Sequence, residues 1–152
     1  MKKPFMNRKN IGVFLVEISQ KIVDKLTAAA IAARNFAYAP YSNFTVGAAL
    51  LTSDDKIFTG CNIESASFSA TNCAERTAFF KAISEGEKNF KAIAVVGGPK
   101  NSPIQKFCPP CGTCRQVMSE FCNPNEFFII LFDGTNHKIY TLNEILPHNF
   151  VL

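Results

Sequence analysis

The sequence contains no tryptophan and no long apolar run, and the lack of such a run limits the kinds of protein that it can be. None of its apolar stretches approaches the roughly 20 residues that a membrane-spanning helix needs, so we expect no membrane partner. The apolar stretch that follows the basic start is short, is interrupted by Glu17 and lacks a small-residue cleavage site. These features argue against an export signal and favour a cytoplasmic protein.

Basic residues are also not gathered into one continuous stretch. The formal charge is only +4, and after the first few positions lysines and arginines stand among acids. A nucleic-acid surface needs a stripe of phosphate-binding residues, so we expect no nucleic-acid partner. Fifteen phenylalanines and 47% hydrophobic residues indicate a packed interior. We expect one domain over residues 1–152, with residues 1–12 as a flexible N-terminal extension.

Hydrophobic periodicity and turn residues predict alternating helices and strands. Helices are expected over residues 14–36, 73–86 and 111–121, strands over 45–51, 57–62, 91–98, 127–132 and 138–142, and a last helical turn over 143–147. The first two strands form a hairpin, whereas the helices that alternate with strands after residue 91 imply parallel pairing. The predicted fold class is therefore α/β, a three-layer αβα sandwich with a mixed five-stranded sheet.

Three cysteines fall at the starts of two predicted helices. Cys73 opens the segment CAE, and Cys111 and Cys114 lie in PCGTC, three positions apart and hence on one face of a first helical turn. Helix N-termini favour thiolates, which are zinc ligands. No second paired spacing offers a fourth ligand, so an open, catalytic zinc site is favoured over a structural one. A redox or structural pair is the alternative for Cys111 and Cys114 alone.

Three thiolates leave a zinc centre with a net negative charge, which weakens the metal as a Lewis acid. Arg76 follows Glu75, and Arg115 follows Cys114. We expect both arginines to offset the thiolate charge through hydrogen bonds around the ligands. Glu75 taken by itself fits a helix-capping role, because Asn72 lies three positions before it. Two positions after a zinc ligand, however, a glutamate is typical of the acid/base group of zinc deaminases.

The segments CAERTAFFKAISEG and PCGTCRQVMSEF closely resemble the small, homotetrameric cytidine deaminases. FAYAPYSNFTVGAALL, GCNIES and ILPHNF resemble the same family, so the resemblance covers most of the chain. It implies one Zn²⁺ per chain on Cys73, Cys111 and Cys114, with Glu75 as the proton shuttle. It also implies hydrolysis of cytidine, and of deoxycytidine, to uridine or deoxyuridine and ammonia, in pyrimidine salvage.

The resemblance further implies the residues that hold a nucleoside. Asn62 and Glu64 would bind the ribose hydroxyls, Phe44 would line the pocket, and the backbone of Ala74 would meet the base. Phe150 would reach the site of a neighbouring subunit in a homotetramer. The sequence LPHNF departs from the small residues usual before that phenylalanine, and Cys108 is an additional thiol.

Simpler interpretations stand beside these assignments. Phe44 and Phe150 could be core or interface aromatics, and Asn62 and Glu64 could be solvated strand-end residues. The remaining thiols and the two histidines are interpreted as spare thiols and surface turn residues: Cys61, Cys108, Cys122, His137 and His148. Two rival functions are deamination of another substrate, such as a nucleoside antibiotic or a base in nucleic acid, and a non-catalytic zinc module.

Overall fold

The computed structural model describes residues 17–150. The chain runs through α1 (Gln20–Arg34), β1 (Phe44–Thr52), β2 (Ile57–Cys61), the short 3₁₀ helix η1 (Phe68–Ala70), α2 (Ala74–Ser84), β3 (Phe90–Pro99), α3 (Gly112–Phe121), β4 (Phe128–Phe132), β5 (His137–Thr141) and α4 (Leu142–Ile145). The predicted flexible extension over residues 1–12 lies outside the described residues. None of the helices within residues 17–150 is long and apolar enough to cross a bilayer.

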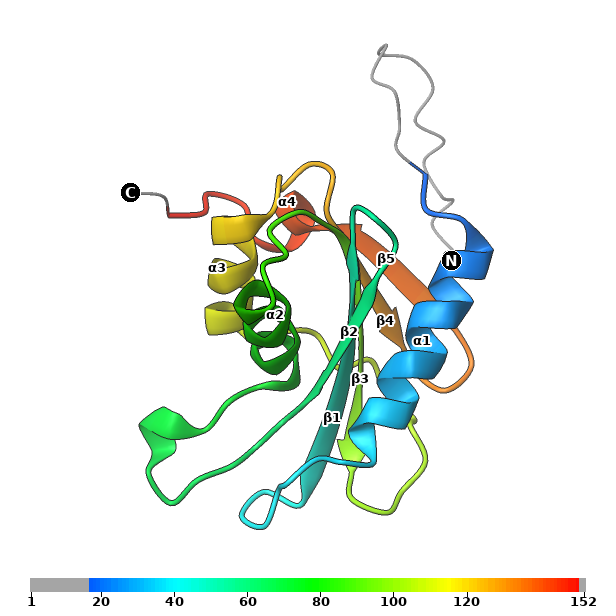
Figure 1. The fold of residues 1–152 in the computed structure, drawn as a ribbon. Coiled ribbons are helices and arrows are strands. Elements are labelled where there is room, and N and C mark those ends of the chain that lie inside the picture. The colour runs from blue at the N-terminus through cyan, green and yellow to red at the C-terminus, as the bar shows by residue number, and fades with distance from the viewer. Residues whose placement is uncertain (1–16, 151–152) are drawn as a thin grey trace.

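The five strands form one mixed sheet in the order β2-β1-β3-β4-β5 (Figure 1). β1 pairs antiparallel with both β2 and β3, and β5 pairs antiparallel with β4. β3 and β4 are parallel, and the crossover between them contains α3. The predicted mixed five-stranded sheet is confirmed, with one parallel pair where a helix separates two consecutive strands.

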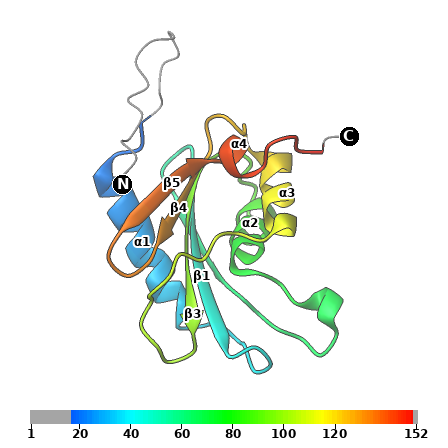
Figure 2. The same cartoon turned by 180° about the vertical axis from the view of Figure 1, so that it is seen from behind.

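Helices cover both faces of this sheet, as the three-layer prediction requires. α1 lies on one face and α2 and α3 on the other, which the two opposite views show (Figures 1 and 2). Alternate residues of β1 separate the two halves of the core: Leu50 packs with α2 and α3, whereas Ala49 and Leu51 pack with α1. Each face of the sheet therefore buries its own apolar cluster.

The first helix begins later and ends earlier than the predicted range of 14–36. Residues 14–16 lie outside the described part, and residues 17–19 are not helical. Ser19 is the N-cap, and its hydroxyl accepts a hydrogen bond from the backbone N–H of Ile22 at 3.4 Å. At the other end Asn35 is the C-cap. The apolar periodicity continues past both caps, which is why it overestimated the length of the helix.

Two glycines let helices approach the sheet closely. A Cβ atom at Gly47 would lie 2.0 Å from the carbonyl oxygen of Ala30 in α1, and one at Gly60 would lie 2.3 Å from the carbonyl oxygen of Ala74 in α2. No side chain fits at either position without moving backbone. Gly60 thus fixes the first turn of α2 against β2, and this turn carries the candidate site.

Candidate active site

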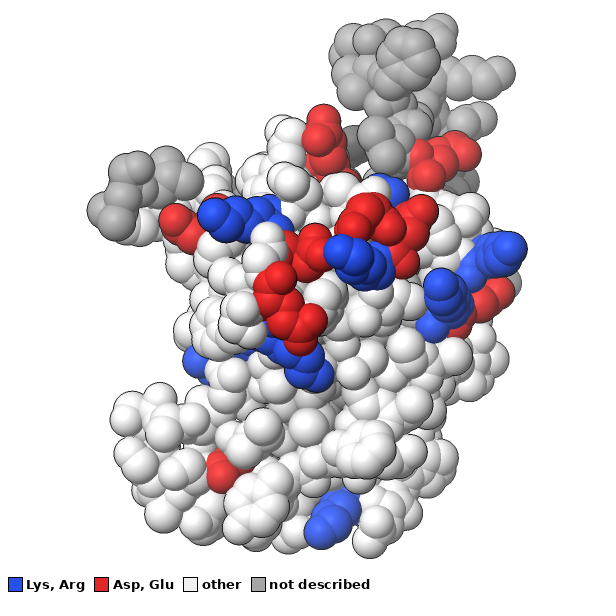
Figure 3. All heavy atoms as spheres, in the orientation of Figure 1, with Lys and Arg blue, Asp and Glu red and all other residues white. Residues whose placement is uncertain are grey.

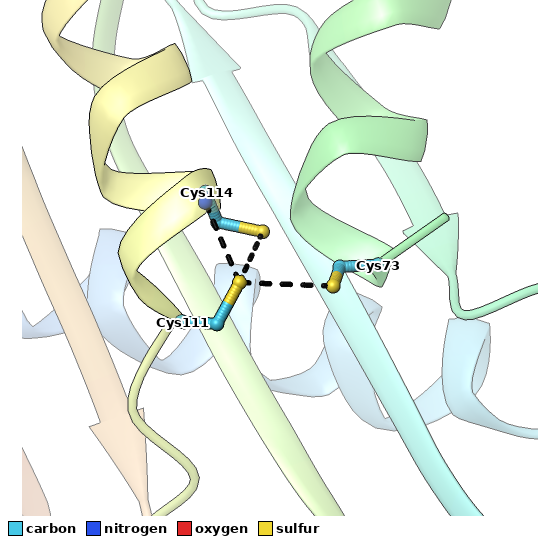
Figure 4. Close-up of side chains that lie close together, drawn as sticks. All are labelled: Cys73, Cys111 and Cys114. Atoms are coloured by element: carbon cyan, nitrogen blue, oxygen red, sulfur yellow. Dashed lines mark hydrogen bonds between the residues drawn. The ribbon is translucent and has the colours of Figure 1, made fainter. Parts of the chain in front are cut away.

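The three predicted zinc ligands come together in the structure. The Sγ atoms of Cys73 and Cys111 lie 3.9 Å apart, those of Cys111 and Cys114 lie 3.5 Å apart, and all three fall within 4.8 Å of one another. Figure 4 shows the thiols pointing toward one another from the starts of α2 and α3. Two segments that are distant in the sequence therefore form one cluster of sulfur atoms.

The cluster fits a zinc ion in spacing and in chemistry. Tetrahedral zinc with Zn–S bonds of about 2.3 Å holds its sulfurs about 3.8 Å apart, close to the separations found here. Cys73 and Cys111 are the N-caps of α2 and α3, and the Cys111 sulfur accepts a hydrogen bond from the N–H of Cys114. No fourth His, Cys, Asp or Glu of residues 17–150 joins the group. Three protein donors leave a tetrahedral position for another ligand.

The surroundings of Cys73 favour its thiolate. Hydrogen bonds from Cys114 and Arg76 lower the pKa of Cys73 to about 5. The same pairing with Cys73, together with burial, raises the pKa of Cys114, because two adjacent thiolates repel each other. A divalent cation between the sulfurs would offset this repulsion and would favour the deprotonated form of a coordinating thiol. One thiolate, that of Cys73, is thus ready to bind a metal.

Glu75 lies in the first turn of α2, next to the first candidate ligand. Its side chain is only 4% exposed. Burial, together with the nearby negative charge of Cys73, raises the pKa of the Glu75 carboxyl to about 7. A carboxyl group with a pKa near neutrality both accepts and releases a proton at physiological pH, as a general acid/base must. The alternative interpretation as a capping residue lacks support, because Cys73 and not Asn72 is the N-cap of α2.

The two candidate charge-offsetting arginines have different contacts. Arg76 donates from Nη2 to the sulfur of Cys73 at 3.4 Å, as predicted for a residue that offsets thiolate charge. The guanidinium of Arg115 instead donates to the carbonyl oxygens of Pro110 and Ile145, at 2.8 Å each. Within residues 17–150 its hydrogen bonds therefore tie the start of α3 to α4, and the predicted bond to a thiolate is absent.

The segment after β2 joins the candidate sugar-binding residues to the metal cluster. Ile63 and Asn72 exchange two backbone hydrogen bonds of 2.9 Å, and Cys73 follows directly. Asn62 lies on the other side of Ile63, and its side-chain amide binds the backbone of β1, accepting from Val46 N and donating to Phe44 O. Asn62, Phe44 and the first ligand are thus held in one hydrogen-bonded unit.

Glu64 lies beside a cavity next to this unit. The cavity has a volume of about 300 Å³ and is lined by Tyr41, Ser42, Glu64, Ser65, Phe68 and Thr71. One carboxylate oxygen of Glu64 accepts from the backbone N–H groups of Tyr41 and Ser42, and the other accepts from the Ser42 hydroxyl. The Ser42 hydrogen bond, with those backbone bonds, lowers the pKa of Glu64, so this carboxylate stays ionised.

The remaining predicted site residues differ in their exposure to solvent. Phe44 begins β1, is 40% exposed, and its ring would touch a Cβ atom at Gly97. Ala74 is fully buried as the first residue of α2. Phe150 has an exposed side chain, and its carbonyl oxygen accepts a hydrogen bond from Gln116 of α3 at 2.7 Å. The expected reach of Phe150 into a neighbouring subunit's site stays a prediction.

Three residues have roles that the sequence did not indicate. Ser42 contacts Glu64 across 22 positions, a separation that no local pattern predicts. Cys108 packs over Gly97 beside the Phe44 ring, and burial raises the pKa of its thiol to about 11, so it stays protonated. His137, expected in a surface turn, begins β5 and lies 3.1 Å from the Thr27 hydroxyl of α1.

Three thiols at two helix tips, on a mixed sheet covered on both faces, have the arrangement of a zinc site in an α/β protein. Residues 20–130 match the family model described as the cytidine and deoxycytidylate deaminase zinc-binding region. The chain therefore belongs to this family of deaminases, which confirms the resemblance and the expected zinc cofactor.

Individual relatives extend this match over most of the chain. A cytidine deaminase from Halalkalibacterium halodurans is 51% identical over 122 residues, which cover 80% of this chain and 88% of the relative. One from Sporosarcina psychrophila is 57% identical over 101 residues, 66% of this chain and 71% of the relative. The crystal structure of cytidine deaminase from Burkholderia pseudomallei is 47% identical, with a TM-score of 0.74, covering 84% of this chain and 98% of that one.

Proposed function

We propose that the protein hydrolyses the amino group of cytidine and deoxycytidine, giving uridine or deoxyuridine and ammonia. The observation that carries this proposal is the pairing of a three-thiol metal site with a buried carboxyl group whose pKa is about 7. The family match and the cytidine deaminases among the relatives support the same reaction. A purely structural zinc module would need neither a proton-transfer group nor an open coordination position.

Cys73, Cys111 and Cys114 would hold the zinc, and the metal would act as a Lewis acid that makes water nucleophilic near neutral pH. Glu75 accepts the first proton of the attacking water and donates it to ring N3, where it remains in the product. The carboxylate then takes the second proton and delivers it to the amino group, which leaves as ammonia. One carboxyl group serves both transfers, and the balance is one water consumed and one ammonia released.

The sugar side of the site selects a free nucleoside. Asn62 and Glu64 would bind the ribose hydroxyls, while Phe44 and the backbone of Ala74 would contact the base. Among residues 17–150, the hydrogen-bond partners of the Glu64 carboxylate are two backbone N–H groups and a hydroxyl, none of which carries a positive charge. The negative charge of Glu64 repels a nearby phosphate, which favours a nucleoside over a nucleotide or a polynucleotide.

The variant Glu75→Gln tests the function directly. Gln has the same shape but cannot transfer a proton, so ammonia release from cytidine should fall by at least about 10² to 10⁴-fold while zinc content and the circular dichroism spectrum stay unchanged. Glu144→Gln, in α4, is the matched control and should retain full activity. Full activity of Glu75→Gln would overturn the mechanism, and turnover of single-stranded DNA or RNA in preference to cytidine would overturn the substrate assignment.

We also propose that the protein is a homotetramer whose sites are completed by neighbouring subunits. Large apolar side chains are strongly exposed on the isolated chain: Phe36, Tyr38, Tyr41, Phe68 and Phe150. Figure 3 shows that, on the face seen in Figure 1, charged side chains cluster toward the top, whereas the lower part, over η1, is almost free of them. Such a surface is typical of an interface. Size-exclusion chromatography with light scattering tests the tetramer, and one zinc per chain is expected.

All six cysteines are unpaired, and the three in the cluster must be reduced to bind a metal. Free thiols of this kind are stable in a reducing compartment. We therefore place the protein in the cytoplasm, where a free-nucleoside deaminase serves pyrimidine salvage. Cell fractionation tests the location, and growth on cytidine as the pyrimidine source tests the role.

A further inference from the structure

The turn before β1 directs three hydrogen-bond donors at one carboxylate. Tyr41 N lies 2.9 Å and Ser42 N 3.2 Å from Oε2 of Glu64, and the Ser42 hydroxyl donates to Oε1. Asn43 follows in the left-handed region with φ of 52°, and its N–H closes the turn on the carbonyl oxygen of Ala39. The geometry of the turn thus aims two consecutive residues at Glu64.

The Ser42 hydroxyl also contacts a second residue of the nucleoside site. Its oxygen accepts a hydrogen bond from the backbone N–H of Phe44 at 3.0 Å. A serine hydroxyl has one donor proton and two acceptor positions, so it binds Glu64 and Phe44 at the same time. One hydroxyl group therefore fixes the position of the sugar-side carboxylate relative to the strand that carries the base-side aromatic.

The hydrogen bonds to Glu64 do not fill all the acceptor positions of its carboxylate. A carboxylate has about four acceptor positions. Two on Oε2 are filled by backbone N–H groups and one on Oε1 by the serine hydroxyl. Residues 17–150 supply no further hydrogen bond to this carboxylate, so one acceptor position remains, on the oxygen that Ser42 orients. Without the serine hydroxyl, Oε1 would have two open positions, and only the two backbone N–H groups on Oε2 would hold the carboxylate.

We propose that Ser42 is a positioning residue that orients Glu64 to accept a sugar hydroxyl of the nucleoside. The proposal rests on the proposed function, because it assumes that Glu64 binds the sugar. It assigns Ser42 a role in specificity toward sugar hydroxyls and none in proton transfer.

Steady-state kinetics on the zinc-loaded enzyme test it with two substrates, cytidine and 2′,3′-dideoxycytidine, which lacks the hydroxyls in question. Ser42→Ala should raise KM for cytidine about 10-fold, the effect of losing one oriented hydrogen bond, and should leave kcat within about two-fold. The same variant should leave KM for the dideoxy nucleoside unchanged. Ser42→Thr, which keeps the hydroxyl, should restore the KM for cytidine.

Two comparison variants separate the possible failures. Ser84→Ala, which removes an exposed hydroxyl at the far end of α2, should match the unmodified enzyme on both substrates. Equal losses of Ser42→Ala on both nucleosides would show a merely structural role and overturn the proposal. If Glu64→Ala also fails to distinguish the two nucleosides, Glu64 does not bind the sugar and the proposal falls for that reason. Failure of the unmodified enzyme to release ammonia from cytidine would instead refute the proposed function.

Discussion

Glu75→Gln should stabilise the zinc-free protein, and the gain should depend on pH in a defined way. The carboxyl group has an ordinary pKa of 4.5 in the unfolded chain and about 7 in the folded one. A pKa that is raised by folding means that the protonated form is favoured in the native state. The stability that it contributes is therefore fully present below pH 4.5 and is lost as the pH rises through 7.

The shift of about 2.5 pH units corresponds to about 3 kcal/mol of unfolding free energy, lost once the buried carboxylate is ionised. Gln cannot ionise, so the variant escapes this loss. The free energy of unfolding of Glu75→Gln minus that of the unmodified protein should be small at pH 5 and should grow by roughly 2 kcal/mol toward pH 8.

Urea unfolding at pH 5, 6, 7 and 8 measures this difference, with a chelator present and the chain concentration held constant. Glu85→Gln, an exposed carboxylate at the other end of the same helix, is the control and should show no growth with pH. A stability difference for Glu75→Gln that is the same at every pH would refute the reasoning, because it would mean that burial does not oppose ionisation of Glu75.

Three further predictions concern the metal cluster and the packing of the sheet. Arg76→Ala should weaken zinc retention roughly 10- to 100-fold in competition with a chromophoric chelator, because it removes the hydrogen bond to the first ligand; unchanged affinity would exclude Arg76 from the site. Cys114→Ser should lower the zinc-to-chain ratio measured by atomic absorption, while Cys122→Ser, outside the cluster, should not. Gly47→Ala should lower the free energy of unfolding by about 2 kcal/mol or more, because its Cβ would lie 2.0 Å from a carbonyl oxygen of α1. Gly112→Ala, whose Cβ meets nothing within 4 Å, should melt near the original temperature.

The sequence predicted the sheet and the sulfur cluster because both depend on local patterns. Alternating apolar strands specify which face is buried, and the spacing of Cys111 and Cys114 puts both on one helical turn. Cys73, which opens the predicted helix over residues 73–86, is the N-cap of α2. These features can be predicted from the sequence because residues close together in the chain determine them.

Contacts across the fold could not be predicted in the same way. Arg115 is adjacent to a ligand in sequence, but its long side chain reaches carbonyl oxygens of α4 that only the tertiary structure brings near. The hydrogen bonds of Ser42 to Glu64 depend on a turn with a left-handed residue, Asn43. Helix α1 was predicted too long because apolar periodicity does not show which residue caps the helix with its hydroxyl group.

Cys73 and Cys111 open two helices and lie 38 positions apart in the chain. An ion gripped by both acts as a removable cross-link, much as a disulfide does, and its binding energy adds to the stability of the folded chain. Loss of the metal in a cell would therefore remove more than the activity. It would also destabilise the folded chain and expose it to proteolysis, so the metal supply would control the amount of the protein as well as its turnover rate.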